Sequence, residues 1–245
     1  MITLENGPRS KGDPGTMDAF VFDLGDTLVE YEGLPPSWVE HYPEALSHLA
    51  SYLGAAPGPA EVDSACRVLR RYNTRLFPRE NEVHFAQILA DLARCFGVDP
   101  VGDPDEAARA FFSVFRQRLR PFPDAGPALA ALSERGARIA VFTDVPYGMP
   151  RALVLEDIRQ SGLEGSFGLI VTSGDVGLRK PAPATLASVA GRLGLQAAQI
   201  THVGNEQKDV DVARAFGCAA VLVDRSGWFP VWGQDRTIRS LMELT

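Results

Sequence analysis

The chain has 245 residues, 45% of them hydrophobic, which is ordinary for a globular protein with one large or two modest domains. Its formal net charge of -7 argues against a sequence-independent grip on nucleic acid or on an anionic membrane, because neither favours an acidic surface. The chain contains no run of about 18 apolar residues, and its first residues lack the apolar core of a signal peptide. We therefore expect a soluble, cytoplasmic protein that binds neither nucleic acid nor membrane.

The amino-terminal part contains an extension followed by a short strand. Residues 1–16 are rich in Gly, Pro, Asn, Ser and Lys without periodicity, so we expect a flexible extension outside the core. Residues 19–22 are apolar, which predicts a strand buried on both faces, and this run ends abruptly at Asp23. Because open α/β sheets bind ligands at the carboxyl ends of their strands, Asp23 and the nearby Asp26 are expected to meet a cation or an electrophile.

Residues 35–120 predict helices, because apolar residues recur three and four positions apart. The residues that carry this pattern are Leu46, Leu49 and Leu53, then Phe85, Ile88, Leu89 and Leu92, and finally Phe111, Phe112 and Phe115. Side chains in or beside this region could line a substrate pocket, although aromatic residues at helical spacing usually belong to a core. These side chains are Tyr31, Trp38, His41 and His84.

After Pro121 the chain alternates between helix and strand. Asp124 precedes a helix that Gly136 can end, and residues 138–144 then predict a buried strand. The elements that follow are helices at about 151–160, 183–193 and 210–216, and strands at 167–173, 200–203 and 219–224. Such alternation requires parallel strands joined by right-handed crossovers. The predicted fold class is therefore α/β, a doubly wound parallel sheet with a helical insert after its first strand.

Four of the predicted strands end in polar residues, and the strands of one parallel sheet present these ends on the same edge. The residues are Asp23 with Asp26, Thr143 with Asp144, Thr172 with Ser173, and Gly204 and Asn205 followed by Asp209. Lys180 follows the third strand and can reach the same edge. This set suits phosphoryl chemistry, because Mg²⁺ held by carboxylates neutralises a phosphate ester before Asp23 attacks, while Lys180 and Thr143 hold the phosphoryl oxygens.

Four segments resemble the ordered motifs of the haloacid dehalogenase superfamily. They are FDLGDTL at 22–28, FTD at 142–144, GLRKP at 177–181 and VGNEQKD at 203–209. The resemblance covers residues 18–243. It implies a Mg²⁺-dependent hydrolase, a phosphatase of a small phosphorylated metabolite that acts through an aspartyl-phosphate.

The resemblance also implies a domain organisation and roles for single residues. Residues 17–34 and 121–245 would form the Rossmann-like catalytic core, and residues 35–120 a helical cap similar to the C1 cap of subfamily I. Asp23 would be the nucleophile, with Thr143 and Lys180 binding the phosphoryl group. The implied metal ligands are Asp23, the backbone carbonyl of Gly25, Asp209 and, through its side-chain carbonyl, Asn205.

The first motif departs from the family's phosphatases, which usually carry a second Asp where this chain has Gly25. Asp26 lies one residue further on, and a one-residue shift on an extended chain turns a side chain to the other face. Asp26 therefore either replaces the missing general acid, through a turn that Gly25 permits, or has a structural role.

Smaller departures surround the expected metal site. Asp144 stands where the family usually has Asn, and Asn205 stands where it usually has Asp, so one formal charge is lost. Glu206 either restores that charge or only favours the helix dipole. Arg179 is expected to be a solvated neighbour, and His202 a core histidine.

Three alternative functions are distinguishable by chemistry. A metal-independent dehalogenase would also lack an acid at Gly25 and would form an aspartyl ester, but the acidic Asp144 and Asp209 favour a site with a cation. A catalytically weakened protein that binds a phosphorylated ligand is also compatible with Gly25. Signalling receiver domains share an Asp, Thr and Lys at a sheet edge but have about half this length. The sequence leaves the substrate and the oligomeric state open.

Overall fold

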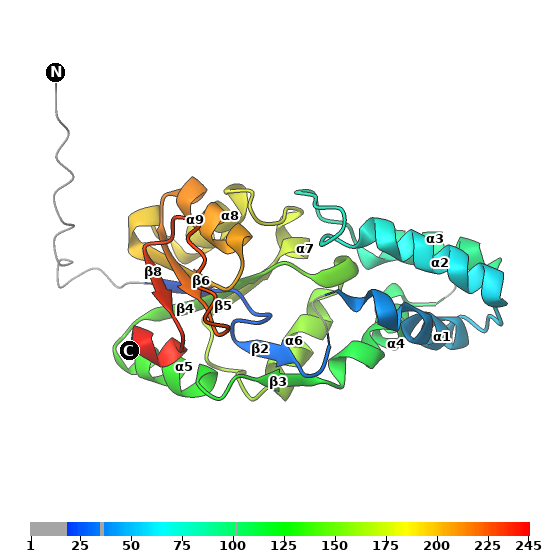
Figure 1. The fold of residues 1–245 in the computed structure, drawn as a ribbon, viewed down its shortest axis with the longest axis horizontal. Coiled ribbons are helices and arrows are strands. Elements are labelled where there is room, and N and C mark those ends of the chain that lie inside the picture. The colour runs from blue at the N-terminus through cyan, green and yellow to red at the C-terminus, as the bar shows by residue number, and fades with distance from the viewer. Residues whose placement is uncertain (1–18, 35–36, 101) are drawn as a thin grey trace, which may run out of the picture.

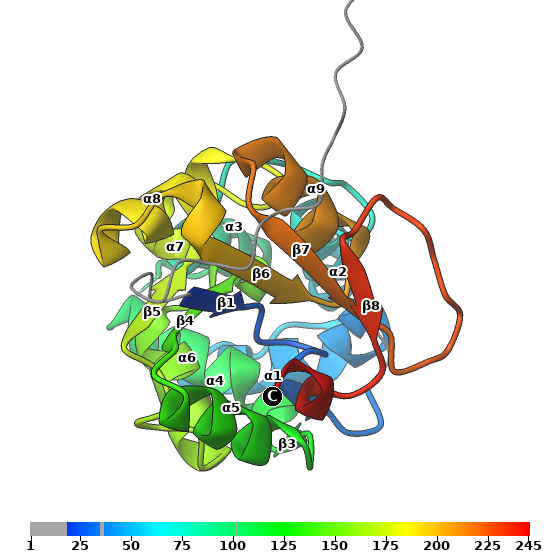
Figure 2. The ribbon, with the colours of Figure 1, turned by 90° about the vertical axis from the view of Figure 1, so that its left-hand side faces the viewer.

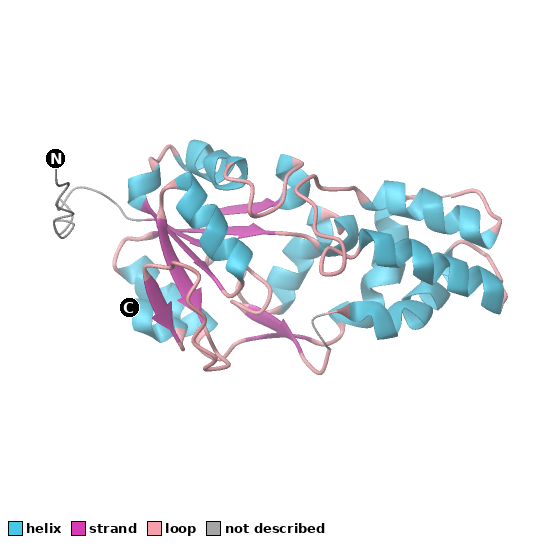
Figure 3. Cartoon of the chain, turned by 45° about the horizontal axis from the view of Figure 1, so that its top comes forward, coloured by secondary structure: helices cyan, strands magenta, loops and turns pink. Residues whose placement is uncertain are grey.

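A computed structural model describes residues 19–34, 37–100 and 102–245, and the extension expected at 1–16 lies outside this part. The described chain has two parts (Figure 1). One contains a six-stranded sheet with helices on both faces, and the other consists of helices (Figure 3). No helix among these described residues is long and apolar enough to cross a membrane.

The six-stranded sheet has the order β5-β4-β1-β6-β7-β8, and every neighbouring pair is parallel. The strands are β1 (Ala19–Phe22), β4 (Arg138–Thr143), β5 (Leu169–Thr172), β6 (Ile200–Gly204), β7 (Ala219–Val223) and β8 (Arg236–Ile238). The first strand of the sheet lies in its interior, and the chain winds outward from it in both directions. This confirms the predicted doubly wound parallel sheet.

Helices cover both faces of this sheet (Figure 2). They are α5 (Ala125–Glu134), α6 (Arg151–Gln160), α7 (Ser173–Val176), α8 (Ala184–Leu193) and α9 (Gln207–Phe216). Along β1, Val21 packs in the core beneath α8 and α9, whereas Phe22 packs in the core of the opposite face. Both faces of β1 are therefore buried, as its apolar sequence predicts.

The helical part begins and ends at a two-stranded antiparallel ribbon, in which β2 (Val29–Tyr31) pairs with β3 (Leu119–Pro121). Its helices are α1 (Tyr42–Tyr52), α2 (Pro59–Tyr72), α3 (Phe85–Phe96) and α4 (Pro104–Arg116). Short 3-10 turns occur in both parts of the chain, at Trp38–His41, Pro146–Gly148, Ala197–Gln199 and Leu241–Leu244. All ten leucine, isoleucine and phenylalanine residues that predicted helices in this part are buried, which confirms the helical periodicity.

Several element boundaries differ from the sequence-based expectation, and the short strands β2, β3 and β8 were not predicted. The strand expected over 167–173 ends at Thr172, because its hydroxyl accepts a hydrogen bond from the Asp175 amide (3.2 Å) and so begins α7. The three-residue strand β8, for example, is too short to produce a periodic pattern.

Candidate active site

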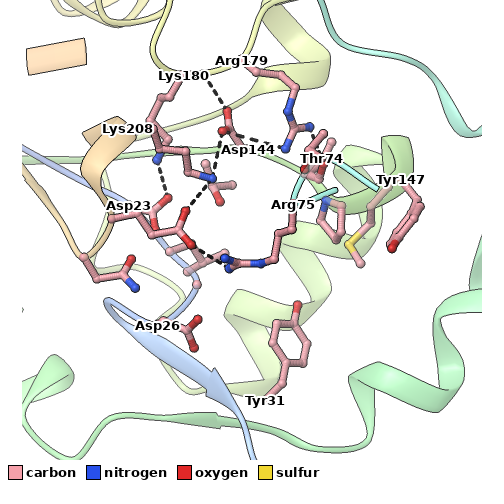
Figure 4. Close-up of a pocket in the computed structure, with 18 of the residues that line it drawn as sticks. Asp23, Asp26, Tyr31, Thr74, Arg75, Asp144, Tyr147, Arg179, Lys180 and Lys208 are labelled. Atoms are coloured by element: carbon pink, nitrogen blue, oxygen red, sulfur yellow. Dashed lines mark hydrogen bonds and ion pairs between the residues drawn. The ribbon is translucent and has the colours of Figure 1, made fainter. Parts of the chain in front are cut away.

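Lys180 joins two carboxylates at the carboxyl edge of the sheet. Figure 4 shows Lys180 with one of them, Asp23. Its ammonium Nζ donates to Asp23 Oδ1 at 2.6 Å and to Asp209 Oδ1 at 2.5 Å, and all three side chains are buried. Asp23 directly follows β1, where its amide donates to the Val203 carbonyl of β6 (2.8 Å). Asp209 lies in the first turn of α9, after β6. Residues 157 positions apart in the sequence thus meet at one edge, as expected for parallel strands.

The charges of this group depend on one another. Burial, opposed by the Lys180 charge and reinforced by Asp209, raises the pKa of Asp23 to about 7. Burial opposes ionisation of Asp209, but Lys180, His202 and Lys208 together outweigh it and hold the pKa of Asp209 well below its usual range. The pKa of Lys180 is raised despite burial, because both carboxylates favour the ammonium. Lys180 therefore stays charged, and Asp23 is the carboxylate that titrates near neutral pH in the ligand-free site.

Asp209 uses both of its carboxylate oxygens. Oδ1 accepts from Lys180 and lies 3.4 Å from His202 Nε2, while Oδ2 accepts from the amides of Asn205 (3.1 Å) and Glu206 (2.9 Å). The carboxylate reaches these amides only because residue 204 is glycine, since a Cβ there would lie 2.3 Å from Asp209 Cγ. His202, expected to be a core histidine, is buried but also contacts this carboxylate.

A cavity of about 660 Å³ opens beside Asp23. Of the residues predicted to form the site, all except Asp209 line it: Asp23, Gly25, Asp26, Thr143, Lys180 and Asn205. Asp26 has a left-handed backbone (φ 56°) in a tight turn, in which its amide donates to the Val29 carbonyl at 2.7 Å. Asp26 is exposed at the cavity surface, and its partial desolvation is the main cause that shifts its pKa upward.

The oxygen donors of this edge suit a hard cation such as Mg²⁺. Among the residues that the structure describes, no three His, Cys, Asp or Glu side chains form a metal-binding cluster, so carboxylates alone would not complete a site. Asp23 and Asp209 nevertheless converge on one ammonium, and Asn205 and Gly25 line the same cavity. Because Mg²⁺ usually takes one or two carboxylates and keeps several waters, this donor set fits it.

A second lysine lies at the cavity. Lys208 Nζ lies 3.3 Å from Asp144 Oδ2 and 2.8 Å from Glu206 Oε2, and Glu206 also pairs with Arg75 Nη2 at 2.7 Å. Asp144 in turn accepts from the Lys180 amide at 3.1 Å. Asp144 and Glu206, which the sequence left without a definite role, are thus both engaged by cations of the cavity.

Arg179 is not the solvated neighbour that the sequence suggested. It is 4% exposed, and its guanidinium donates to the Val145 carbonyl (2.7 Å) and to Glu82. Glu82 comes from the helical insert, and its Oε2 also accepts from the Ser173 hydroxyl at 2.5 Å. The expectation of solvation was wrong because the partner of Arg179 is almost 100 residues away in the chain and belongs to no recognisable pattern.

The backbone around Glu82 is tied to the same loops. The Glu82 amide donates to the Gly177 carbonyl (2.9 Å), and the Arg179 amide donates to the Glu80 carbonyl (2.7 Å). Gly148 packs so closely that a Cβ there would lie 2.3 Å from the Val83 carbonyl oxygen. We call these contacts of residues 80–85 the clasp. The clasp links the insert to the loops that carry Asp144 and Lys180.

The chain resembles known proteins over most of its length. A protein-family model described as "Hydrolase: haloacid dehalogenase-like hydrolase" matches residues 17–217. The chain is 32% identical over 201 residues to a phosphoglycolate phosphatase of Yersinia pestis, covering 82% of this chain and 78% of that protein. It is 36% identical over 127 residues to a phosphoserine phosphatase of Thermus thermophilus, covering 51% of this chain and 49% of that protein. The matched part spans about half the length of the first curated relatives, between 45% and 59%.

Solved structures show the same fold. A HAD phosphatase from Thermococcus onnurineus superposes with a TM-score of 0.64 at 23% identity, covering 93% of this chain and 96% of that chain. Crystal structures of dehalogenases share the fold as well, at 23% identity or less. The fold therefore does not separate a phosphatase from a dehalogenase, and the distinction must come from the site.

Proposed function

Because the chain belongs to the haloacid dehalogenase-like hydrolases, we propose that it is a phosphatase of a small phosphorylated metabolite and that Asp23 is its nucleophile. The observation that carries this proposal is the buried Lys180 ammonium, which binds both Asp23 and Asp209 beside the cavity. An extra cation next to a carboxylate suits an anionic phosphoryl substrate, which would otherwise be repelled. The phosphatase names of similar proteins support the same reaction.

The proposed reaction begins at the free oxygen of Asp23. Lys180 engages Oδ1, and Oδ2 receives no hydrogen bond from the residues that the structure describes. Oδ2 would attack phosphorus as the ester phosphorus–oxygen bond breaks, and the leaving oxygen would take a proton and depart as the alcohol. Water would then cleave the aspartyl-phosphate to inorganic phosphate and restore the Asp23 carboxylate. Thr143 and Lys180 would bind phosphoryl oxygens, and Lys208 would add positive charge.

Mg²⁺ is the proposed cofactor. Asp23, the Gly25 carbonyl and Asn205 would hold it, with Asp209 binding directly or through water. When bound, it would neutralise phosphoryl charge. A cytoplasmic location is likewise our proposal, based on the composition.

Residues 35–120 are proposed to act as a cap over a core formed by residues 17–34 and 121–245. Support comes from the cavity, whose wall includes Trp38, Arg75 and Arg79 of the insert beside the polar residues of the sheet edge. A cap in this position would exclude water and contribute to substrate choice.

The general acid is proposed to be Asp26, whose carboxyl lines the cavity next to the sheet edge that carries Asp23. General acid–base catalysis contributes roughly 10²- to 10⁴-fold. We therefore expect Asp26→Asn to lower kcat for an alkyl phosphate by about 10²-fold or more, with a smaller effect on an aryl phosphate whose leaving group needs no proton. A kcat within about threefold of wild type on both substrates would make Asp26 structural.

The function is tested on the purified full-length chain with para-nitrophenyl phosphate, phosphoglycolate, phosphoserine and 2-haloacids, each with Mg²⁺ and with chelator. We expect phosphate release that chelator abolishes and that Asp23→Asn lowers by about 10³-fold or more. The matched control is Asp63→Asn, on the exposed face of α2, which should act like wild type. Halide release that chelator does not change would instead identify a dehalogenase. Binding of phosphate esters without turnover would identify a ligand-binding protein.

A further inference from the structure

The cavity beside Asp23 is larger than the smallest phosphorylated metabolites require. Its volume of about 660 Å³ lies within the range of roughly 300–1,000 Å³ that encloses drug-sized ligands. A two-carbon ester such as phosphoglycolate would leave much of this space filled with water. The residues around the space that the phosphoryl group leaves free therefore indicate which kind of leaving group the substrate carries.

The cavity has a polar end and an aromatic wall. The polar end contains Asp23, Lys180 and Lys208, and Tyr31 and Tyr147 lie away from it in Figure 4. The wall consists of Tyr31, Trp38 and Tyr147, whose rings are in contact: the Tyr31 and Trp38 centroids lie 5.3 Å apart, and those of Trp38 and Tyr147 6.2 Å. The apolar residues Leu34, Met149 and Val154 line the same cavity.

The Tyr147 part of the aromatic wall presents ring carbon to the cavity, because its hydroxyl is already paired. The Tyr147 hydroxyl is hydrogen-bonded to the Tyr42 hydroxyl (2.6 Å), which also accepts from Asn73 Nδ2 (3.1 Å). Trp38 stacks on Phe115 behind it, with centroids 4.1 Å apart. The ring of Tyr147 is thereby held facing the cavity, while its polar atom is already satisfied.

The backbone fixes this wall in place before any ligand binds. Tyr147 has a left-handed conformation (φ 47°), which a bulky residue adopts only where its surroundings impose it. The next residue, Gly148, packs against the clasp with no room for a side chain. A preformed apolar surface loses little entropy when a ligand packs on it.

We propose that the substrate is a phosphate monoester whose alcohol part carries a bulky apolar or aromatic group, and that this group packs on the wall of Tyr31, Trp38 and Tyr147. The proposal rests on the proposed phosphatase function and specifies its substrate class. In the overall reaction, water cleaves the phosphorus–oxygen bond and releases inorganic phosphate and an apolar alcohol. Small polar esters such as phosphoglycolate would be poor substrates, because they leave the wall uncovered.

The substrate class is tested with esters that differ in apolar size but have primary alcohols of similar acidity as leaving groups. We expect kcat/KM to rise from ethyl phosphate to hexyl phosphate and 3-phenylpropyl phosphate. Each buried methylene group corresponds to about a fourfold gain, so hexyl phosphate should exceed ethyl phosphate by at least about tenfold. Phosphoglycolate should resemble ethyl phosphate.

Matched variants test whether the wall of Tyr31, Trp38 and Tyr147 causes the preference for esters with large apolar groups. Tyr31→Ala should lower the hexyl-to-ethyl ratio at least about threefold, whereas Tyr31→Phe, which keeps the ring, should preserve it. Leu34→Asp places a charge in the apolar part and should lower the ratio further. Its control is Leu76→Asp, because Leu76 is 44% exposed and does not line the cavity.

Equal kcat/KM for ethyl and hexyl phosphate, or a ratio that Tyr31→Ala and Leu34→Asp leave unchanged, would overturn the proposal while the phosphatase function stands. If no ester is hydrolysed, the phosphatase function fails, and calorimetric binding of ethylphosphonate and hexylphosphonate decides the remaining question. Tighter binding of hexylphosphonate would support the apolar wall, and equal affinity would overturn it.

Discussion

Two of the ionic contacts that join the helical insert to the α/β part differ in character. In the clasp, the side chains of Glu82 and Arg179 are 1% and 5% exposed. The second contact, here called the α4–α6 clamp, pairs Arg109 with Glu156 through two hydrogen bonds of 2.6 and 2.7 Å. In that pair Arg109 is 42% exposed and Glu156 23%.

Because the two contacts differ in burial, we expect them to contribute differently to the stability of the fold. A buried ion pair is costly to desolvate and tolerates no missing partner, whereas a partly hydrated pair contributes a small, salt-sensitive stabilisation. The clasp lies next to Asp144 and Lys180, because Arg179 approaches the Asp144 carboxylate that accepts from the Lys180 amide. The α4–α6 clamp only holds α4 against α6.

The largest expected effect comes from breaking the clasp. Glu82→Ala leaves the buried Arg179 guanidinium with only the more distant Asp144 carboxylate at 3.9 Å, which should lower the free energy of unfolding by about 3–5 kcal/mol. Urea denaturation measures this loss. The matched control is Glu80→Ala, which removes an exposed carboxylate from the same segment but keeps the backbone hydrogen bond. If Glu82→Ala lowers the free energy of unfolding by less than about 1 kcal/mol, the clasp is no stronger than a surface ion pair.

Breaking the α4–α6 clamp should lower the free energy of unfolding by a smaller amount. Glu156→Gln removes the charge that Arg109 and Arg116 share, and we expect a loss of about 1–2 kcal/mol at pH 7, discounted for partial hydration. Turnover of a phosphate ester should be unchanged, because this pair lies outside the cavity lining. A loss of activity at unchanged fold would show that the clamp also adjusts the site.

The contribution of the α4–α6 clamp should also depend on pH. The Arg109 hydrogen bonds, helped by Arg116, lower the pKa of Glu156 from its ordinary 4.5 to about 2. A folded-state pKa below the unfolded one gives stability that is complete above about pH 4.5 and is lost as the pH falls toward 2. The stability difference between wild type and Glu156→Gln should therefore be constant from pH 6 to 8 and shrink below pH 4.5. A difference that grows on acidification would contradict the lowered pKa.

The sequence predicted the parts of the site that depend on strand ends. Asp23, Thr143 and Lys180 were placed together because parallel strands share a carboxyl edge, and all three line one cavity. Their chemical roles stay predictions until the assays are done.

The clasp was beyond prediction for a physical reason. Glu82 lies in an aperiodic segment between α2 and α3, and only the three-dimensional packing of the insert brings it to Arg179. A lone glutamate in a polar stretch is usually solvated, so its sequence carries no sign of a buried partner. The same limit explains why Arg179 was expected to be exposed.

One substitution made at both contacts gives the smallest effect and the most direct comparison. Arg109→Lys keeps the charge but loses the bidentate geometry toward Glu156, and because Arg109 is 42% exposed, the cost should be only about 0.5 kcal/mol. Arg179→Lys should cost several times more, since an ammonium cannot bond both Glu82 and the Val145 carbonyl with the geometry of the buried guanidinium. Thermal or urea unfolding of the two variants measures both losses under identical conditions. Equal losses would mean that burial does not distinguish the two contacts.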